Sequence, residues 1–277
     1  MPSNARERFA QLVASAEEDL NLAEAALLIA QEEQPELDIP TYLNRLDELA
    51  ATVRARLPES PSFAAIIQEL NTFLFREEGL AGNQSDFGDP RNSFLNEVLD
   101  RKLGIPITLS LVYIEVGTRL GVPLVGVGFP GHFLVKYEDA QGETVLDPFM
   151  GGMILTQEQL EEKLRTMYGP QNPFMAQIPR LLAPADKRDI LIRMLRNLKQ
   201  IYMHKEDLER ALSVMERILL IAPDHPVEVR DRGAIHHRMG HQQPAVRDFQ
   251  RYLELAPKAE DAKAVRSIMV RTMAQLN

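Results

Sequence analysis

The chain has 277 residues, which gives an expectation of two domains at about 150 residues each. Apolar residues make up 45% and charged residues 26%, which excludes the disordered and collagen-like classes. The net charge of −9 disfavours binding to nucleic acid, and the absence of cysteine excludes disulfides, thiolate metal sites and a cysteine nucleophile.

The start of the chain, Met1 to Arg8, shows no apolar stretch behind a basic end, so no secretory signal is expected. The most apolar segment, Ile105 to Val116, is far shorter than the roughly 20 residues that a membrane helix needs. The sequence therefore predicts a soluble cytoplasmic protein.

The first hundred residues have the pattern of amphipathic helices. Apolar residues recur at steps of three and four over residues 43–53, after Pro40, and over residues 63–74, after Pro61. Both stripes predict helices that face the core. Residues 79–91 have the composition of a loop, and a loop of this length can carry function.

Residues 105–120 are apolar on all sides, with Pro106 at the start and Gly121 at the end, which predicts a buried helix. Three short β-rich runs follow at 124–129, 133–137 and 143–146. They predict a small antiparallel sheet covered by the preceding helices, with a turn at Asp139–Gly142. Thr156 and Gln159 then form the pattern of a capping box, which predicts a helix over 156–168.

The last ninety residues contain a repeat. Pro223 and Pro257 lie 34 residues apart, and the same offset relates Ala211 to Ala245. This is the period of tetratricopeptide helix pairs, although Lys199 replaces the expected glycine of the first copy and Arg232 replaces the expected leucine of the second. A final helix over residues 259–276 is expected to cap the stack.

These signals predict two domains. The first covers residues 1–180, helical over 1–121, with a sheet region at 122–150 and the helix at 156–168. The second, residues 186–277, holds the repeats and the capping helix. Four prolines between Gly169 and Pro184 predict an interdomain linker.

His132 and Asp147 are the candidate chemical pair. His132 precedes one predicted strand, Asp147 ends a later one, and the midpoint between them falls on the predicted turn. In such a hairpin the two lie nearly opposite, so the carboxylate can orient the imidazole as in a nucleophile–base–orienter triad. The start of the buried helix is a suitable third position, because a helix N-terminus favours a developing thiolate or oxyanion.

Four motifs carry a family resemblance: Asn92-Ser93-Phe94-Leu95, Leu103 to Ser110, Gly128 to Phe133, and Leu146-Asp147-Pro148-Phe149. Together they resemble the transglutaminase-like (papain-related) superfamily and, more narrowly, the bacterial SirB-type proteins. The resemblance implies an α+β domain with a small antiparallel sheet, followed by an all-α tetratricopeptide-like domain. It also implies that His132 and Asp147 are the base and the orienter, and that Pro106 occupies the position of the nucleophilic cysteine.

The main hypothesis is a non-catalytic interaction or regulatory protein, a pseudoenzyme that binds a protein or peptide through its repeats. The alternative is a hydrolase or acyltransferase in which the hydroxyl of Thr108 or Ser110 acts with His132 and Asp147. A purely structural interpretation is also open, in which His132 caps strand-end carbonyls and Asp147 fixes the turn at Pro148.

No cofactor, metal, membrane or nucleic-acid partner is predicted. His237 and His241 are four residues apart, the spacing of two metal ligands on one helix face. Gly240 lies between them and no acidic residue is near, so metal binding is not expected. The oligomeric state is left open.

Overall fold

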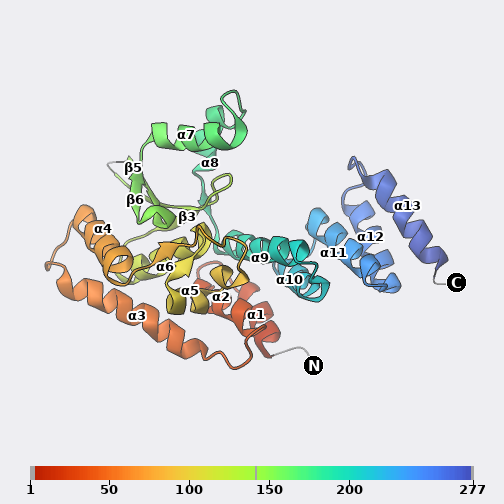
Figure 1. Cartoon of the computed structure of the whole chain (residues 1–277), viewed down its shortest axis with the longest axis horizontal. Helices are drawn as coiled ribbons and strands as arrows, with labels where there is room; N and C mark the ends of the chain where they lie inside the picture. Colours follow the sequence, from red (N-terminus) through yellow and green to blue (C-terminus); the bar gives the residue numbers. More distant parts are fainter. Residues whose placement is uncertain (1–3, 141, 276–277) are drawn as a thin grey trace. The chain divides into compact units, whose positions relative to one another are not determined.

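The computed structural model describes residues 4–140 and 142–275 (Figure 1). Three parts of the predicted features lie outside the described residues: positions 1–3 at the start of the first domain, 141 in the turn, and 276–277 at the end of the capping helix. The chain forms two compact units. One holds the chain up to Phe9 and Ser15–Met194, and the other holds Ala10–Ala14 and the chain from Leu195 onward.

The part of the chain before the sheet is helical, as predicted. Its elements are α1 (Asn4–Val13), α2 (Leu22–Gln31), α3 (Ile39–Arg56), α4 (Phe63–Asn71), the π-helix η1 (Thr72–Glu77), the 3-10 helix η2 (Pro90–Ser93), α5 (Leu95–Arg101) and α6 (Pro106–Arg119). The hydroxyl of Ser62 caps α4 by accepting from the Ala65 N–H. Within the loop predicted at 79–91, β1 (Ala81–Gly82) pairs in parallel with β2 (Leu103–Gly104), just before α6.

The predicted antiparallel sheet is confirmed. It has five strands in the order β6-β5-β4-β3-β7: β3 (Val125–Val127), β4 (Leu134–Asp139), β5 (Gly142–Asp147), β6 (Met153–Leu155) and β7 (Pro184–Ala185). Val135 pairs with Leu146, so residues 132 and 147, which were predicted to lie nearly opposite, are offset by two residues along the hairpin. His132 instead lies in the turn before β4, where its N–H donates to the Phe129 carbonyl at 3.0 Å.

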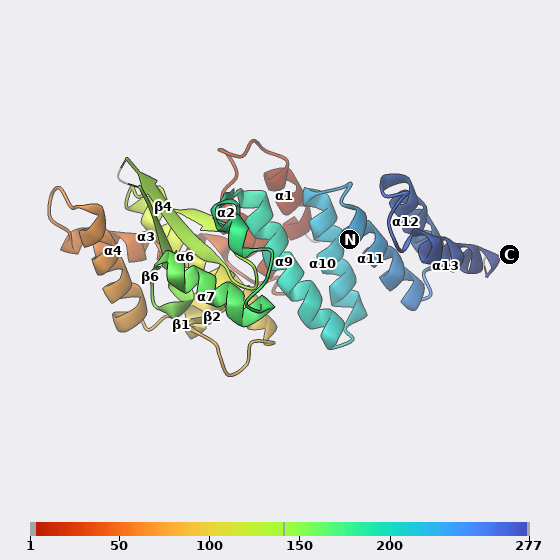
Figure 2. The ribbon, with the colours of Figure 1, turned by 90° about the horizontal axis from the view of Figure 1, so that it is seen from above.

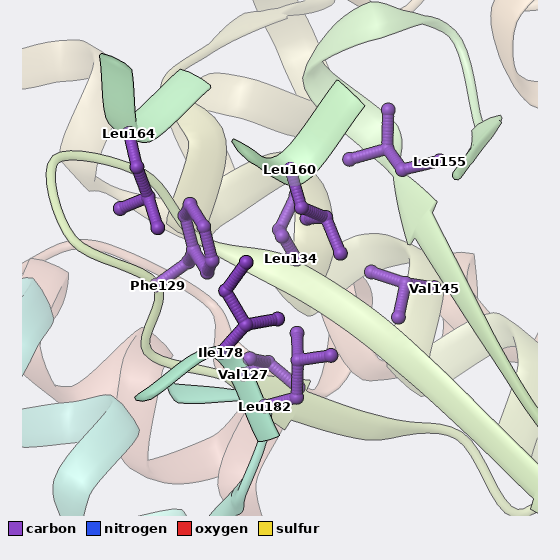
Figure 3. Close-up of a cluster of buried hydrophobic side chains, with 9 residues drawn as sticks. All are labelled: Val127, Phe129, Leu134, Val145, Leu155, Leu160, Leu164, Ile178 and Leu182. Atoms are coloured by element: carbon purple, nitrogen blue, oxygen red, sulfur yellow. The ribbon is translucent and has the colours of Figure 1, made fainter. Parts of the chain in front are cut away.

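The sheet is covered on both faces (Figure 1). The buried helix α6 packs on one face, next to the short 3-10 helix η3 (Pro148–Met150). Helices α7 (Gln157–Tyr168) and α8 (Ile178–Leu181) cover the other face, and the 3-10 helix η4 (Met175–Gln177) packs against α8. Figure 3 shows the core between the sheet and the α7–α8 layer, formed by the apolar side chains of Val127, Phe129, Leu134, Val145, Leu155, Leu160, Leu164, Ile178 and Leu182.

The proline-rich segment predicted as an interdomain linker is part of the first unit. Ile178 and Leu182 belong to the core under α7, and Pro184–Ala185 pairs with β3 as strand β7. The apolar residues between the prolines explain this difference, because burying them on the sheet is more favourable than exposing them to water. The unit boundary falls further on, between Met194 and Leu195, inside helix α9 (Lys187–His204).

The second unit contains the predicted repeats. Its helices after α9 are α10 (Leu208–Ile221), α11 (Pro226–Arg238), α12 (Gln242–Leu255) and α13 (Ala262–Ala274), each packed on the next (Figure 2). Ala211 and Ala245 are fully buried, as the repeat pattern predicts. A Cβ on Gly233 would lie 3.0 Å from the Phe249 ring, so this glycine permits the close approach of α11 and α12.

Ion pairs account for both departures from the repeat pattern. Lys199 stands at the position of the expected glycine, and its Nζ lies 2.6 Å from Glu228 and 2.7 Å from Asp231. The lysine therefore links α9 to α11 through two ion pairs. Arg232 donates to both carboxylate oxygens of Asp248, at 2.8 and 2.7 Å. Among the described residues, no helix is both long and apolar enough to cross a membrane.

Candidate functional site

The site is organised around the carboxylate of Asp147, the last residue of β5, whose side chain has no exposed surface. Its Oδ1 lies 2.9 Å from His132 Nε2 and accepts from the Met150 N–H at 3.3 Å. Its Oδ2 lies 3.1 Å from Lys163 Nζ, on α7. Asp147 therefore connects the turn before β4, the start of η3 and helix α7.

The carboxylate is held ionised. Burial by itself would raise the pKa of Asp147, but the hydrogen bond and charge of His132, together with the charge of Lys163, hold this pKa below its ordinary value. An ionised carboxylate can only accept hydrogen bonds, so His132 Nε2 carries the proton that it shares with Asp147. The imidazole is thereby oriented, and its Nδ1 has no hydrogen-bond partner within the described part of the chain.

The backbone and ring of His132 are both fixed. An Arg193 guanidinium N–H donates to the His132 carbonyl at 2.8 Å. The imidazole meets the Phe149 ring edge-on, with centroids 5.9 Å apart. Phe149 in turn covers Gly82, where any Cβ would overlap the ring. Because Gly82 pairs with Gly104, this chain of contacts runs from the imidazole to the segment that precedes α6.

The imidazole borders a cavity of about 390 Å³, and 12% of its side-chain surface is exposed. The cavity is mostly apolar, and two charged residues, Glu162 and Lys163, are among those that line it. It is lined by Gly131, His132, Met153, Leu155, Gln159, Glu162, Lys163, Thr166 and Met167. An oriented imidazole in such a cavity can bind a ligand or exchange a proton with it.

The two candidate hydroxyls are engaged elsewhere. Thr108 is fully buried, and its O–H donates to the Asn92 carbonyl at 2.7 Å while its oxygen accepts from the Ile105 N–H at 3.1 Å. Ser110, also fully buried, donates to the Phe133 carbonyl at 3.4 Å. Neither residue lines the cavity. Pro106, at the position that the resemblance implies for the nucleophile, is the buried first residue of α6.

The structure thus joins His132 to Asp147, and no hydrogen bond among the described residues joins either of them to Thr108 or Ser110. One element of the structural interpretation is also present, because Asp147 caps the η3 turn through the Met150 N–H. Sequence reasoning missed Lys163 and Arg193. Lys163 could have been suspected only as a cation within a helix predicted next to the sheet, and no local pattern marks Arg193.

The side chains of His237 and His241 have different partners. His237 Nδ1 lies 3.0 Å from the Thr272 hydroxyl, whereas His241 Nδ1 lies 3.3 Å from His236 Nδ1. Across residues 4–140 and 142–275, no group of three or more histidine, cysteine or acidic residues is placed to hold a metal ion.

Comparisons with known proteins agree with the resemblance stated from the motifs. Residues 40–196 match the family model described as transglutaminase-like superfamily, and residues 198–269 match a tetratricopeptide repeat model. The chain is 40% identical to a UPF0162 protein of Xylella fastidiosa (strain Temecula1), over 92% of this chain and 90% of that protein. It is 29% identical to a UPF0162 protein of Vibrio cholerae, over 90% and 91%. It is 26% identical to Protein SirB1 of Salmonella typhimurium, over 87% and 89%. The two matching domains together support a role in protein interaction.

Proposed function

This chain belongs to the transglutaminase-like superfamily, and from that premise we propose that it is a non-catalytic, cytoplasmic protein-interaction protein. One observation carries the proposal: the His132–Asp147 pair is kept in a chain without cysteine. The position that the resemblance gives to the nucleophile holds Pro106, which has no nucleophilic group. The retained pair then serves to bind a ligand rather than to activate a nucleophile.

The hydroxyl-dependent alternative has less support. A serine or threonine nucleophile must lie within hydrogen-bond distance of its base, about 2.6–3.2 Å. The O–H groups of Thr108 and Ser110 donate instead to backbone carbonyls in the interior. A hydrolase or acyltransferase built on either one would need the start of α6 to rearrange. The intact His132–Asp147 pair is the observation in favour of this alternative.

The repeat unit supplies the second part of the proposal. Tetratricopeptide helices present an extended surface to a peptide or protein. Three apolar side chains on different repeat helices are exposed: Leu220 on α10 by 39%, Val227 on α11 by 44% and Val270 on α13 by 57%. The partner is proposed to be a protein or peptide, since the net charge of −9 is unfavourable for binding nucleic acid.

Turnover is tested with the full chain, using p-nitrophenyl acetate for hydrolysis and a glutamine peptide with a fluorescent amine for acyl transfer. We expect the rates of the wild-type chain and of His132→Ala to be equal. General-base catalysis is worth about 10²–10⁴-fold, so a real activity would be easily seen. A rate that disappears in His132→Ala, and also in Thr108→Val or Ser110→Ala, would establish the enzyme alternative.

Interaction is tested by quantitative capture on the tagged chain from its own cells, together with fractionation of those cells to locate the chain. Leu220→Asp and Val227→Asp place charges on the exposed repeat surface and should reduce capture. Phe87→Asp is the matched control, because Phe87 is 56% exposed and lies in the first unit. Equal capture by all three variants and the wild type would count against a role of the repeats.

A further inference from the structure

Strand β6 is one of the two outer strands of the sheet, and among the described residues no strand pairs with its outer edge. Two of its three side chains are apolar and open to water, Met153 at 40% and Ile154 at 56% exposed, whereas Leu155 is buried. Protein sheets usually protect such edges with charged residues, proline or a covering element. An apolar, uncovered edge indicates a surface that is covered when a partner binds.

A cavity lies beyond this edge on each face of the sheet. Leu155 lies opposite Val145 and faces α7, where the His132 imidazole borders the 390 Å³ cavity. Ile154 faces the other way and borders a cavity of about 800 Å³ against α4 and η1. Met153 borders both cavities. Because side chains alternate between faces along a strand, a strand added to β6 would direct successive side chains into the two cavities in turn.

The larger cavity has one charged residue in its wall, Arg76. Its other lining groups are apolar or neutral: Phe63, Ala64, Ile67, Gln68, Asn71, Thr72, Phe75, Thr144, Met150, Gly151, Gly152, Met153 and Ile154. The side chain of Asn71 is already used, since its Oδ1 accepts from Tyr113 at 2.8 Å and its Nδ2 donates to the Gly152 carbonyl at 2.9 Å. Arg76 is exposed and forms no ion pair with any described residue. The wall therefore offers an uncompensated guanidinium beside apolar surface, which complements a carboxylate.

We propose that β6 binds an extended peptide as an added strand, with apolar side chains in the two cavities and a carboxylate facing Arg76. Main-chain hydrogen bonds to β6 supply affinity, and the alternation of the cavities supplies specificity. The inference rests on the proposed function and names the chemistry of a partner at the same site. One of the two cavities holds the oriented imidazole, so the docked peptide passes next to His132.

The probe is a displayed library of random peptides selected on the full-length chain. We expect enrichment of consecutive apolar residues followed or preceded by an aspartate or glutamate. Binding of an enriched, fluorescently labelled peptide should weaken at least about tenfold in Ile154→Asp, a loss of about 1.4 kcal/mol. Phe87→Asp is the matched control, because Phe87 is 56% exposed and lines neither cavity. Bound peptide should also slow hydrogen exchange of the β6 amides.

A charge exchange tests the role of Arg76. Arg76→Glu should weaken the acidic peptide, and a peptide with lysine in place of its acidic residue should regain affinity for that variant. The proposal is overturned if no peptide is enriched over a blank support, or if Ile154→Asp binds as well as the wild type. It is also overturned if decanoate occupies the cavity beside Arg76 and no peptide binds there. A dimer of this chain that forms through β6 and that Ile154→Asp dissociates would overturn it as well.

The failure of this inference and that of the proposed function are distinguishable. Turnover that depends on His132 would contradict the proposed function and leave a peptide site at β6 intact. Capture of a partner that depends on the repeat surface but not on Ile154 would contradict the inference and leave the proposed function intact.

Discussion

Replacement of His132 by alanine tests how strongly the buried carboxylate of Asp147 depends on the imidazole. Removing one partner of a buried charged pair costs about 3–5 kcal/mol. Lys163 remains at 3.1 Å from Oδ2, and the Met150 N–H remains at 3.3 Å from Oδ1, so part of the compensation persists. We therefore expect the free energy of unfolding that hydrogen exchange measures at the sheet amides to fall by about 2–3 kcal/mol at pH 7. This corresponds to a rise of about 30-fold to 160-fold in the equilibrium constant for opening.

The same substitution should change the sign of the pH dependence. In the wild-type chain the pKa of Asp147 is lowered, because the His132 and Lys163 interactions outweigh burial. Its stabilisation is therefore fully present above the unfolded value near 3.9 and is lost as the pH falls through the lowered folded value. Without His132, burial should raise the pKa of Asp147 above the unfolded value. The penalty of the variant should then be largest at neutral pH and shrink as the carboxyl group is protonated.

The assay is urea-dependent hydrogen exchange of the β4 and β5 amides at pH 7 and pH 4.5, followed by mass spectrometry. Amides of α12 in the second unit serve as an internal reference that should not change. In a double variant that also carries Asp147→Asn, the pH dependence of the penalty should disappear. A loss below about 0.5 kcal/mol at pH 7, or an equal loss at both pH values, would refute the reasoning.

Three further predictions concern packing and buried polar groups. Gly82→Ala should destabilise the first unit by about 1–3 kcal/mol in thermal unfolding, because the added Cβ overlaps the Phe149 ring. A second substitution, Phe149→Ala, should restore most of this loss, and a double variant as unstable as Gly82→Ala would show that the ring is not the cause. Thr108→Val should cost about 1–3 kcal/mol in the same measurement, because it leaves buried backbone groups unsatisfied, and a neutral result would contradict a structural role for the hydroxyl. Gly233→Ala should destabilise the repeat unit by about 1–2 kcal/mol, because the added Cβ crowds the Phe249 ring. The loss should appear as faster hydrogen exchange of the α11 and α12 amides, and unchanged exchange would contradict the prediction.

The helices, the hairpin and the repeats could be predicted from the sequence because each has a local signal. The apolar stripe after Pro61 produced α4, the Thr156–Gln159 pair capped α7, and the 34-residue offset placed Ala211 and Ala245 in equivalent buried positions. These signals depend on residues a few positions apart or on a repeated pattern, so the chain carries them without reference to its tertiary fold.

The proximity of His132 and Asp147 could also be anticipated, because both flank one hairpin and the turn between them is marked by its composition. The register could not. The strands pair so that Val135 faces Leu146, which leaves His132 in the turn before β4, offset by two residues from Asp147. Small changes in where a turn closes are decided by packing of the strand faces, and composition alone does not settle them.

The helical periodicity, the repeat, the absence of a thiol and the two residues of the pair all follow from the order of amino acids. Three other features depend on how the chain packs: Lys163 completes the surroundings of Asp147, Asn92 holds the Thr108 hydroxyl, and β6 is left as an open edge. Those features join residues from separate elements. They arise from which faces the helices and strands bury against one another, and no local pattern in the chain encodes that choice.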